Sequence, residues 1–527
     1  MRTGAAKRST AIALTVLLSL AAVTSVQSRP FSRERLVKVL SWIGTHPVPV
    51  SQVLRIAFAE EIRKQGVDFK PDTNDQRMFA VSGATNAELL AIRESYRESP
   101  FTLAQIKNAL EVISDGSVDR AVREKVIADI ERRGVDFRVD GQIERDLGAL
   151  RADEVFVASV MKGYRGTDFH AGWVEVGESL HAIDVNPVSG RVYVASTGKP
   201  GTLWLITPGN NQVSKAADIF ENRVPSIVVV DPVSNLVILP LPGDRKVITI
   251  GGSVPEVKFL ALAADIVGGV AVDPVAGRIY TTLFVQKGAG AAVQGYQAQV
   301  PVPEESGIIS ADLSTGSQRS IVVGEFVREI DVDPLRRKIL ALFDKGVAIV
   351  DARDGSVQRK VVIGNQPCGL VLNLVAGAAF AGDCGARRIF RIGYDGALEG
   401  SFPTSAMPEE LFVDPVSNRL FWVSRDGLAW SDFDGREISS FTNGFTYSGD
   451  LPDVTKRGVA VDPLRNRAFA VAARNKDLIV IEDGRSEVRT LSLPGPPNGY
   501  LALNPATGHL YVPLENGNVA IVREGAP

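Results

Sequence analysis

The stretch Ala182-Ile-Asp-Val-Asn-Pro187, followed by Arg191-Val-Tyr-Val-Ala195, contains the pattern from which the fold of this 527-residue chain can be predicted. An apolar run ends in Asn-Pro, a short turn follows, and a second apolar run begins. This order predicts two antiparallel strands, because Asx side chains hydrogen-bond to the backbone ahead of them and proline presets φ for a turn. The pattern recurs seven more times, and we call the Asp or Asn of each copy the marker residue. The marker residues are Asn186, Asp231, Asp273, Asp333, Asn373, Asp414, Asp462 and Asn504.

The spacing of the marker residues predicts the architecture. Successive intervals are 45, 42, 60, 40, 41, 48 and 42 residues, and the long one contains an insertion at Phe284–Ser306. A period of about 40–45 residues with short strands is typical of a β-propeller, in which each repeat forms one four-stranded blade. The residues one and three positions before every marker are aliphatic, as expected where neighbouring sheets pack face to face. The sequence therefore predicts a mainly β fold over residues 166–527, an eight-bladed propeller with seven blades as the alternative.

Two further stretches carry a family resemblance. Val347-Ala-Ile-Val-Asp-Ala-Arg-Asp-Gly355 and the Gly-Asn-Gln-Pro of 364–367 resemble YVTN/NHL-type propellers, while Arg419-Leu-Phe-Trp422 is similar to the YWTD version. The resemblance covers roughly 350 residues. It implies that each marker strand is the innermost of its blade, that the turn after it lies on the bottom face, and that the loops before it surround the channel mouth on the top face. Propellers host many unrelated functions, so the resemblance implies fold rather than activity.

The ends of the propeller region are complementary. The last repeat reaches about Val522 after only three strands, and an additional strand is expected at Gly172-Trp-Val-Glu-Val-Gly177. We predict that this strand completes the last blade, because closing the ring removes exposed sheet edges. The marker residues themselves are interpreted as structural.

Residues 29–165 form a predicted α-helical domain of two repeats. Ile62-Arg-Lys-Gln-Gly-Val-Asp-Phe69 matches Ile130-Glu-Arg-Arg-Gly-Val-Asp-Phe137 at an offset of 68. In both copies we expect a helix to end at the glycine, Gly66 or Gly134, where a positive φ costs a glycine little. The motif is interpreted as helix–turn packing, and the repeats as a surface for other proteins.

The N-terminus and composition predict an exported protein. Residues 1–28 combine Arg2, Lys7 and Arg8 with the apolar stretch Ala11–Val26, which is typical of a signal peptide; an uncleaved membrane anchor is the alternative. We therefore expect a periplasmic or secreted protein with no membrane span after cleavage. The formal net charge is −3, and removing those three basic residues leaves −6. A mildly acidic chain is a poor partner for nucleic acid.

The two cysteines are the only ones in the chain. Cys368 starts a predicted inner strand and Cys384 ends the strand that pairs back on it, so the two are expected nearly opposite one another. A disulfide is the favoured interpretation for an exported protein. A catalytic thiol or a metal ligand is the alternative.

Candidate site residues gather at the predicted top mouth of the channel. Carboxylates there could bind Ca²⁺, another divalent cation or a basic ligand. The alternative is that Arg328 and Arg457 neutralise these carboxylates. No Gly-x-Ser-x-Gly, His-Glu-x-x-His or Walker motif is present, and the five tryptophans are interpreted as packing residues. The candidates are His181, Asp184, Arg328, Glu329, Asp331, Glu409, Glu410, Arg457 and Tyr500.

These observations predict an exported binding or scaffold protein. Its expected partner is a protein, peptide or glycan, recognised by the propeller top face and the helical repeats. No catalytic residue and no cofactor is assigned. The alternatives are a metal-dependent propeller hydrolase or lactonase using Asp184, Glu329, Asp331 and Glu410, and an envelope scaffold without a ligand of its own.

Overall fold

The computed structural model describes most of the chain from residue 30 to residue 524. The segments outside the described residues are 1–29, 98–100, 115–119, 136–138, 140, 164–168, 198–200, 221–224, 226, 242–244, 252–255, 263–265, 284–305, 365, 425–426, 443–457, 473–475, 483–487 and 525–527. The predicted signal peptide and the insertion Phe284–Ser306 fall almost wholly in these segments.

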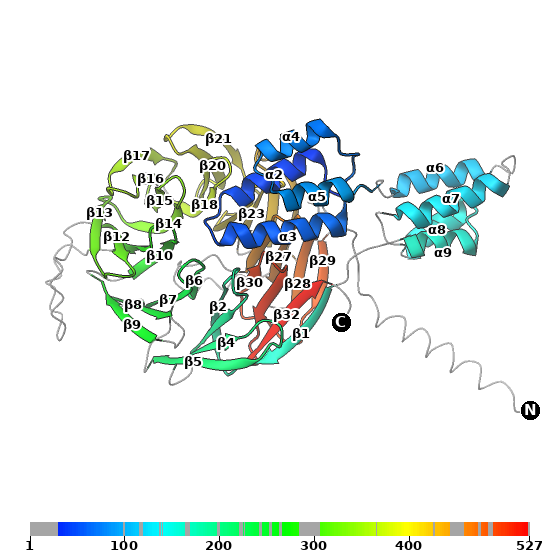
Figure 1. Ribbon diagram of the computed structural model, residues 1–527. Coiled ribbons are helices and arrows are strands. Elements are labelled where there is room, and N and C mark those ends of the chain that lie inside the picture. Colours follow the sequence, from blue (N-terminus) through cyan, green and yellow to red (C-terminus); the bar gives the residue numbers. More distant parts are fainter. Residues whose placement is uncertain are drawn as a thin grey trace, which may run out of the picture. The chain divides into compact units, whose positions relative to one another are not determined.

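Eight four-stranded antiparallel sheets confirm the eight-bladed propeller (Figure 1). Blade 1 consists of β2 Leu180–Val185, β3 Val192–Ser196, β4 Gly201–Ile206 and β5 Val213–Phe220, and blade 2 consists of β6 Val229–Asp231, β7 Leu236–Leu241, β8 Lys246–Gly251 and β9 Glu256–Ala261. Blade 3 consists of β10 Ile266–Asp273, β11 Arg278–Leu283, β12 Gly307–Asp312 and β13 Gln318–Val322, and blade 4 consists of β14 Val327–Asp333, β15 Lys338–Phe343, β16 Gly346–Asp351 and β17 Val357–Val362. Blade 5 consists of β18 Pro367–Asn373, β19 Ala378–Asp383, β20 Arg388–Gly393 and β21 Leu398–Pro403, and blade 6 consists of β22 Glu410–Asp414, β23 Arg419–Ser424, β24 Gly427–Asp432 and β25 Glu437–Phe441. Blade 7 consists of β26 Val459–Asp462, β27 Arg467–Ala472, β28 Asp477–Glu482 and β29 Val488–Ser492, and blade 8 consists of β30 Ala502–Asn504, β31 His509–Pro513, β32 Asn518–Glu524 and β1 Phe169–Glu175.

Blade 8 closes the ring as the sequence predicts. Its strand order is β1-β32-β31-β30, so a strand from before blade 1 becomes the outer strand of the last blade. The amides of Val176 and Gly177 both donate to the Gly517 carbonyl, each at 3.1 Å. The first and last strands of the propeller are thereby paired, and β32 lies between β1 and β31 in the sheet.

The marker residues shape the turns, which confirms their structural interpretation. In blade 6, Asp414 Oδ1 accepts hydrogen bonds from the backbone N–H groups of Val416 at 2.9 Å and Ser417 at 3.1 Å. A marker oxygen accepts at least one such bond in every blade. Each side chain therefore caps the turn that sends its inner strand into the second strand.

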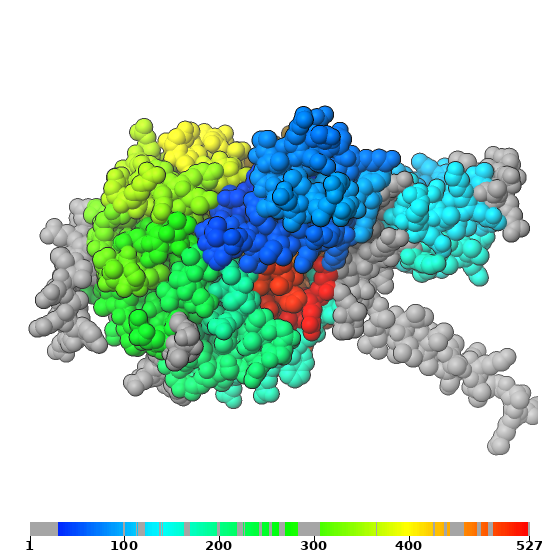
Figure 2. Space-filling model, in the orientation of Figure 1, coloured from blue at the N-terminus to red at the C-terminus, as the bar shows by residue number. Residues whose placement is uncertain are grey.

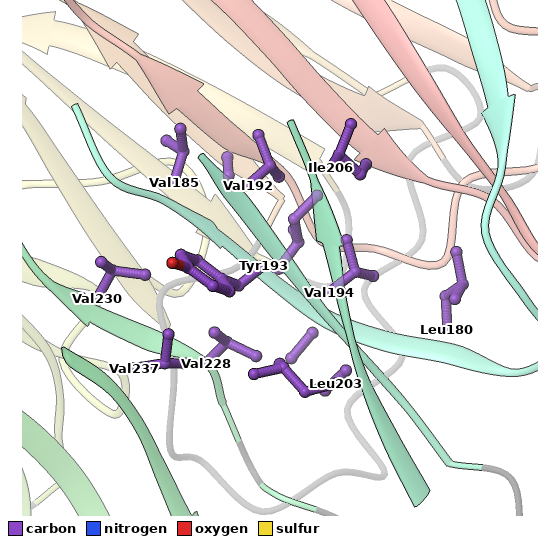
Figure 3. Close-up of a cluster of buried hydrophobic side chains, with 14 of the residues drawn as sticks. Leu180, Val185, Val192, Tyr193, Val194, Leu203, Ile206, Val228, Val230 and Val237 are labelled. Atoms are coloured by element: carbon purple, nitrogen blue, oxygen red, sulfur yellow. The ribbon is translucent and has the colours of Figure 1, made fainter. Parts of the chain in front are cut away.

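Apolar side chains from several strands of each blade fill the spaces between blades. Between blades 1 and 2, Val228, Val230 and Val237 pack with Tyr193 and Leu203 in one buried cluster (Figure 3). In an isolated blade these apolar faces would be exposed to water. Packing neighbouring sheets face to face buries both faces, which stabilises the ring.

Eight described helices form two sets of four. The first set is α2 Arg33–Gly44, α3 Val50–Gln65, α4 Thr73–Val81 and α5 Asn86–Glu94; the second is α6 Leu103–Ser114, α7 Arg120–Arg133, α8 Gly141–Ala149 and α9 Glu154–Gly163. The helices α3 and α7 end at Gly66 and Gly134, with φ of 84° and 81°, as predicted. A short parallel bridge joins Phe31 to Val67 in the first set, and Phe101 to Val135 in the second.

The two helical sets belong to different compact units. One unit contains residues 97–170, and the other contains 31–96 together with 171–523. This boundary falls inside the region 29–165 that the sequence assigns to one helical domain. We call residues 31–96 the docked repeat, because its core cluster includes Val416 and Leu464 of the propeller. Figure 2 shows this repeat, in blue, in close contact with the propeller surface.

The docked repeat lies on the bottom face of the propeller. We call the residue two positions after each marker residue the turn-apex residue, and five of these eight residues pack against the docked repeat. They come from five consecutive blades, 5, 6, 7, 8 and 1. They are Val375, Val416, Leu464, Ala506 and Val188.

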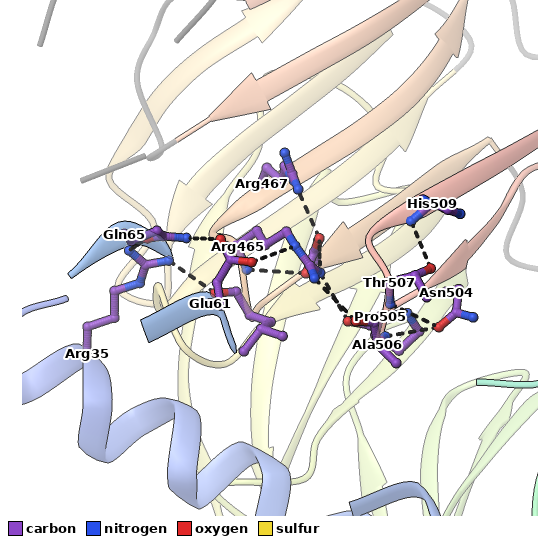
Figure 4. Close-up of polar contacts among 12 residues, drawn as sticks. Arg35, Glu61, Gln65, Arg465, Arg467, Asn504, Pro505, Ala506, Thr507 and His509 are labelled. Atoms are coloured by element: carbon purple, nitrogen blue, oxygen red, sulfur yellow. Dashed lines mark hydrogen bonds and ion pairs between the residues drawn. The ribbon is translucent and has the colours of Figure 1, made fainter. Parts of the chain in front are cut away.

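A buried polar network joins the docked repeat to blade 7 (Figure 4). Arg465 Nε lies 3.3 Å from Glu61 Oε2 on α3, and Arg465 Nη1 lies 3.2 Å from the marker carboxylate of Asp462. Gln65 donates to Glu61 at 2.6 Å, and Arg35 donates to the Leu464 carbonyl at 3.2 Å. Each buried charge therefore has a partner of opposite sign, as burial requires.

Candidate functional site

A cavity of about 450 Å³ lies in the central channel. Its walls are the inner strands β2, β6, β10 and β14, with Tyr500 and Leu501 just before β30. Most of the lining is aliphatic or glycine. Three carboxylates and one phenol bring polar chemistry to it, and these groups are Asp184, Glu329, Asp331 and Tyr500.

Asp184 is a strongly perturbed carboxyl group of the cavity. Its Oδ2 accepts a hydrogen bond from the Val230 amide of blade 2 at 2.7 Å, and its Oδ1 accepts one from the Val185 amide at 2.8 Å. Burial raises the pKa of Asp184 to about 6, although the two amide donors act in the opposite direction. Asp184 therefore changes charge near neutral pH while it also links blade 1 to blade 2.

The raised pKa of Asp184 gives a pH-dependent stability. An unfolded Asp has a pKa of about 4, so the folded chain holds this proton more tightly than the unfolded chain does. We expect the free energy of unfolding to fall by on the order of 2 kcal/mol as the pH rises from about 4 to beyond 6. Urea denaturation at several pH values measures this. In Asp184→Asn the fall should be smaller by about this amount, and an equal fall in both proteins would contradict the assignment.

Blade 4 supplies the other two carboxylates. Glu329 Oε2 accepts a hydrogen bond from the Leu370 amide of blade 5 at 2.8 Å, which repeats the link that Asp184 makes between blades 1 and 2. Asp331 Oδ1 accepts from the Val332 amide at 2.9 Å. Each of these carboxylates therefore supports an inner strand with one oxygen while the side chain borders the cavity.

Tyr500 and His181 form a pair beside these carboxylates. The Tyr500 hydroxyl lies 3.2 Å from His181 Nε2, and the ring centroids are 5.2 Å apart. Because Tyr500 is part of the cavity lining, this contact places a titratable imidazole behind the phenol. The structure thus brings five of the nine sequence candidates together.

The remaining candidates do not line the cavity. Arg328 is exposed and forms an ion pair with Asp344 at 3.2 Å, whereas the sequence suggested that it neutralises the channel carboxylates. Glu409 and Glu410 lie at the start of β22 and are half-buried. Arg457 lies outside the described residues.

The predicted disulfide is confirmed. Cys368 and Cys384 are bonded, with their Cα atoms 5.9 Å apart. The bond links the start of the inner strand β18 to the turn after β19. It therefore fixes one blade at the edge of the channel mouth, and the thiol interpretations of these cysteines are set aside.

Within the described part of the chain, no group of three or more His, Cys, Asp or Glu side chains could hold a metal ion. The set Asp184, Glu329, Asp331 and Glu410 is thus not gathered into a ligand cluster. No described helix is long and apolar enough to cross a membrane.

The contacts between the docked repeat and the bottom face are not predicted from the sequence, although the turns contain a signal for them. Turns on a protein surface are usually polar, yet every turn-apex residue of this propeller is apolar. Five are covered by the docked repeat. The other three, from consecutive blades 2, 3 and 4, are exposed: Val233, Val275 and Leu335.

The fold and the channel define a closed eight-bladed β-propeller. The propeller is similar to Saccharomyces cerevisiae Sqt1, with 12% identity and a TM-score of 0.51 over 67% of this chain and 98% of that chain. A structure titled Dos1 propeller matches with 12% identity and a TM-score of 0.48 over 67% of this chain and 94% of that one. No family model and no curated protein matches the chain. These likenesses concern the fold alone.

Proposed function

We propose that this protein is an exported binding protein that recognises a basic group of a protein or peptide partner in the channel. The observation that carries the proposal is the cavity in which Asp184, Glu329 and Asp331 border a largely aliphatic wall. Propellers commonly serve as scaffolds for protein–protein interaction. The disulfide is compatible with export.

The cavity suits the side chain of a lysine or arginine. Its aliphatic walls would contact the methylene stem, and the carboxylates would face the charged head. A charge pair removed from solvent loses much of its binding energy when one member is neutralised. Since burial raises the pKa of Asp184 to about 6, binding should weaken as the pH falls below that value, toward the affinity of Asp184→Asn.

The experiment is a capture from the extracytoplasmic fraction of the host. The unchanged mature protein, Asp184→Asn and Asp354→Asn are immobilised, and bound proteins are quantified by mass spectrometry. Asp354 is an exposed carboxylate on an outer turn of blade 4, so its amide variant is a matched control. We expect a partner that Asp354→Asn retains and that Asp184→Asn captures at least tenfold less.

Two results would contradict the proposal. Equal capture by Asp184→Asn and the unchanged protein would remove the channel from recognition. Tightly bound stoichiometric metal that is lost in Asp184→Asn and Glu329→Gln would favour the metal-dependent hydrolase instead.

A further inference from the structure

Blades 4 and 7 share one turn sequence but differ in what covers it. Asp333-Pro-Leu-Arg336 and Asp462-Pro-Leu-Arg465 are identical, and both connect an inner strand to the second strand on the bottom face. In blade 7 the docked repeat covers the turn, and Leu464 is 0% exposed. In blade 4 the equivalent residue, Leu335, is 47% exposed.

The arginines of the two turns adopt the same arrangement. Arg465 pairs with its own marker carboxylate and donates to the carbonyls of Pro505 and Ala506 in the next blade. Arg336 pairs with Asp333 at 2.9 Å and donates to the corresponding carbonyls of blade 5, those of Leu374 and Val375. The guanidinium group is therefore held in place at both sites by its own turn and its neighbouring blade.

One contact distinguishes the two sites. Arg465 also faces Glu61 of α3, and its side chain is 7% exposed. The side chain of Arg336 is 41% exposed, and no helix carboxylate faces it among the described residues. Next to it, Val275 of blade 3 and Val233 of blade 2 are 42% and 39% exposed. We call this combination, Val233, Val275, Leu335 and Arg336, the open turns.

We propose that the open turns bind an amphipathic helix of a partner protein, one that presents a carboxylate to Arg336 beside apolar side chains. The proposal extends an interface that the protein already uses, since α3 brings Glu61 and buried apolar residues to the identical turn of blade 7. It goes beyond the channel function, because this surface lies on the opposite face from the channel mouth. A helix that lays an apolar stripe and one charge on a surface is an established mode of recognition.

The test uses the helix that the chain itself supplies as a template. The probe is a fluorescent peptide of Val50–Gln65, stapled between positions 52 and 56, which are both exposed in α3. The staple is needed because an isolated helix of this length is marginal in water. The site on blade 7 is occupied by the protein's own α3, so the peptide can reach only the open turns.

We expect the peptide to bind the full-length protein, and Arg336→Glu and Leu335→Asp each to weaken binding at least tenfold. Arg353→Glu, an equal charge reversal at an exposed position of the same blade, should leave binding unchanged. A peptide carrying Glu61→Arg should regain binding to Arg336→Glu, since the charges are exchanged. Circular dichroism of each variant shows that the fold is retained, and Leu335→Asp, at an exposed position, serves if Arg336→Glu does not fold.

Two outcomes overturn the proposal. The first is no binding of the stapled peptide, or binding that neither variant weakens. The second is self-association of the unchanged protein that Arg336→Glu abolishes, which would assign the open turns to a second copy of the chain. A negative capture result for Asp184→Asn does not bear on this surface, so the two proposals fail separately.

Discussion

Arg465→Ala is expected to lower the free energy of unfolding by about 3–5 kcal/mol, whereas Arg336→Ala is expected to cost about 1 kcal/mol or less. The two arginines occupy the same position in identical turns, so they differ mainly in burial and in the contact to Glu61. Removing Arg465 leaves the carboxylates of Glu61 and Asp462 buried without this cation. Two buried carboxylates left without this cation cost more than the loss of a pair whose arginine is 41% exposed, as in Arg336 with Asp333.

Urea denaturation of the two variants measures the difference. Hydrogen exchange shows which part of the protein is destabilised, because the amides of α3 should exchange faster in Arg465→Ala if the docked repeat is released from blade 7. Unchanged exchange in α3 together with equal destabilisation by both variants would show that the network does not hold the repeat.

Trp430→Ala is expected to destabilise the protein by about 3–5 kcal/mol, and Trp173→Ala by less than about 1 kcal/mol. Trp430 is 0% exposed and packs between blades 6 and 7 with Phe412, Val459 and Ile479. Its removal leaves a void between two sheets that the closed ring cannot bring together. Trp173 lies on the outer strand β1 and is 56% exposed.

The indole N–H of Trp430 has no acceptor in the described structure, so the expected loss is one of packing. Chemical denaturation of both variants, followed by circular dichroism, measures the effect. A loss for Trp430→Ala no larger than that for Trp173→Ala would contradict a role in blade packing. The exposure of Trp173 also corrects the interpretation of all five tryptophans as packing residues.

The propeller was predictable because its determinants are local. Each marker residue caps the turn that follows it, and aliphatic residues alternate along the strand before it. Eight copies of this local pattern predict eight blades. The last repeat contains only three strands, so the pattern also predicts that β1 completes it. The pairing of Cys368 with Cys384 followed from the same register, since both lie at matching ends of a strand pair.

The candidate site was predictable only in part. The position of Asp184, Glu329, Asp331 and Tyr500 at the channel follows from the strand pattern. The partners of their oxygens do not, because the Val230 and Leu370 amides come from neighbouring blades. The exposed ion pair of Arg328 with Asp344 likewise depends on the turn between β15 and β16.

The blades, the closure of the ring and the duplication of the helices could be predicted from the sequence, since each depends on residues close together in the chain or on a repeated pattern. The packing of the docked repeat on the propeller, in one compact unit with it, is seen in the folded chain and not in the sequence. That outcome depends on contacts such as Glu61 with Arg465, more than 400 residues apart. Tertiary contacts also determine that the Asp-Pro-Leu-Arg turn of blade 7 is buried while the identical turn of blade 4 is exposed. Identical residues therefore acquire different roles when different surfaces cover them.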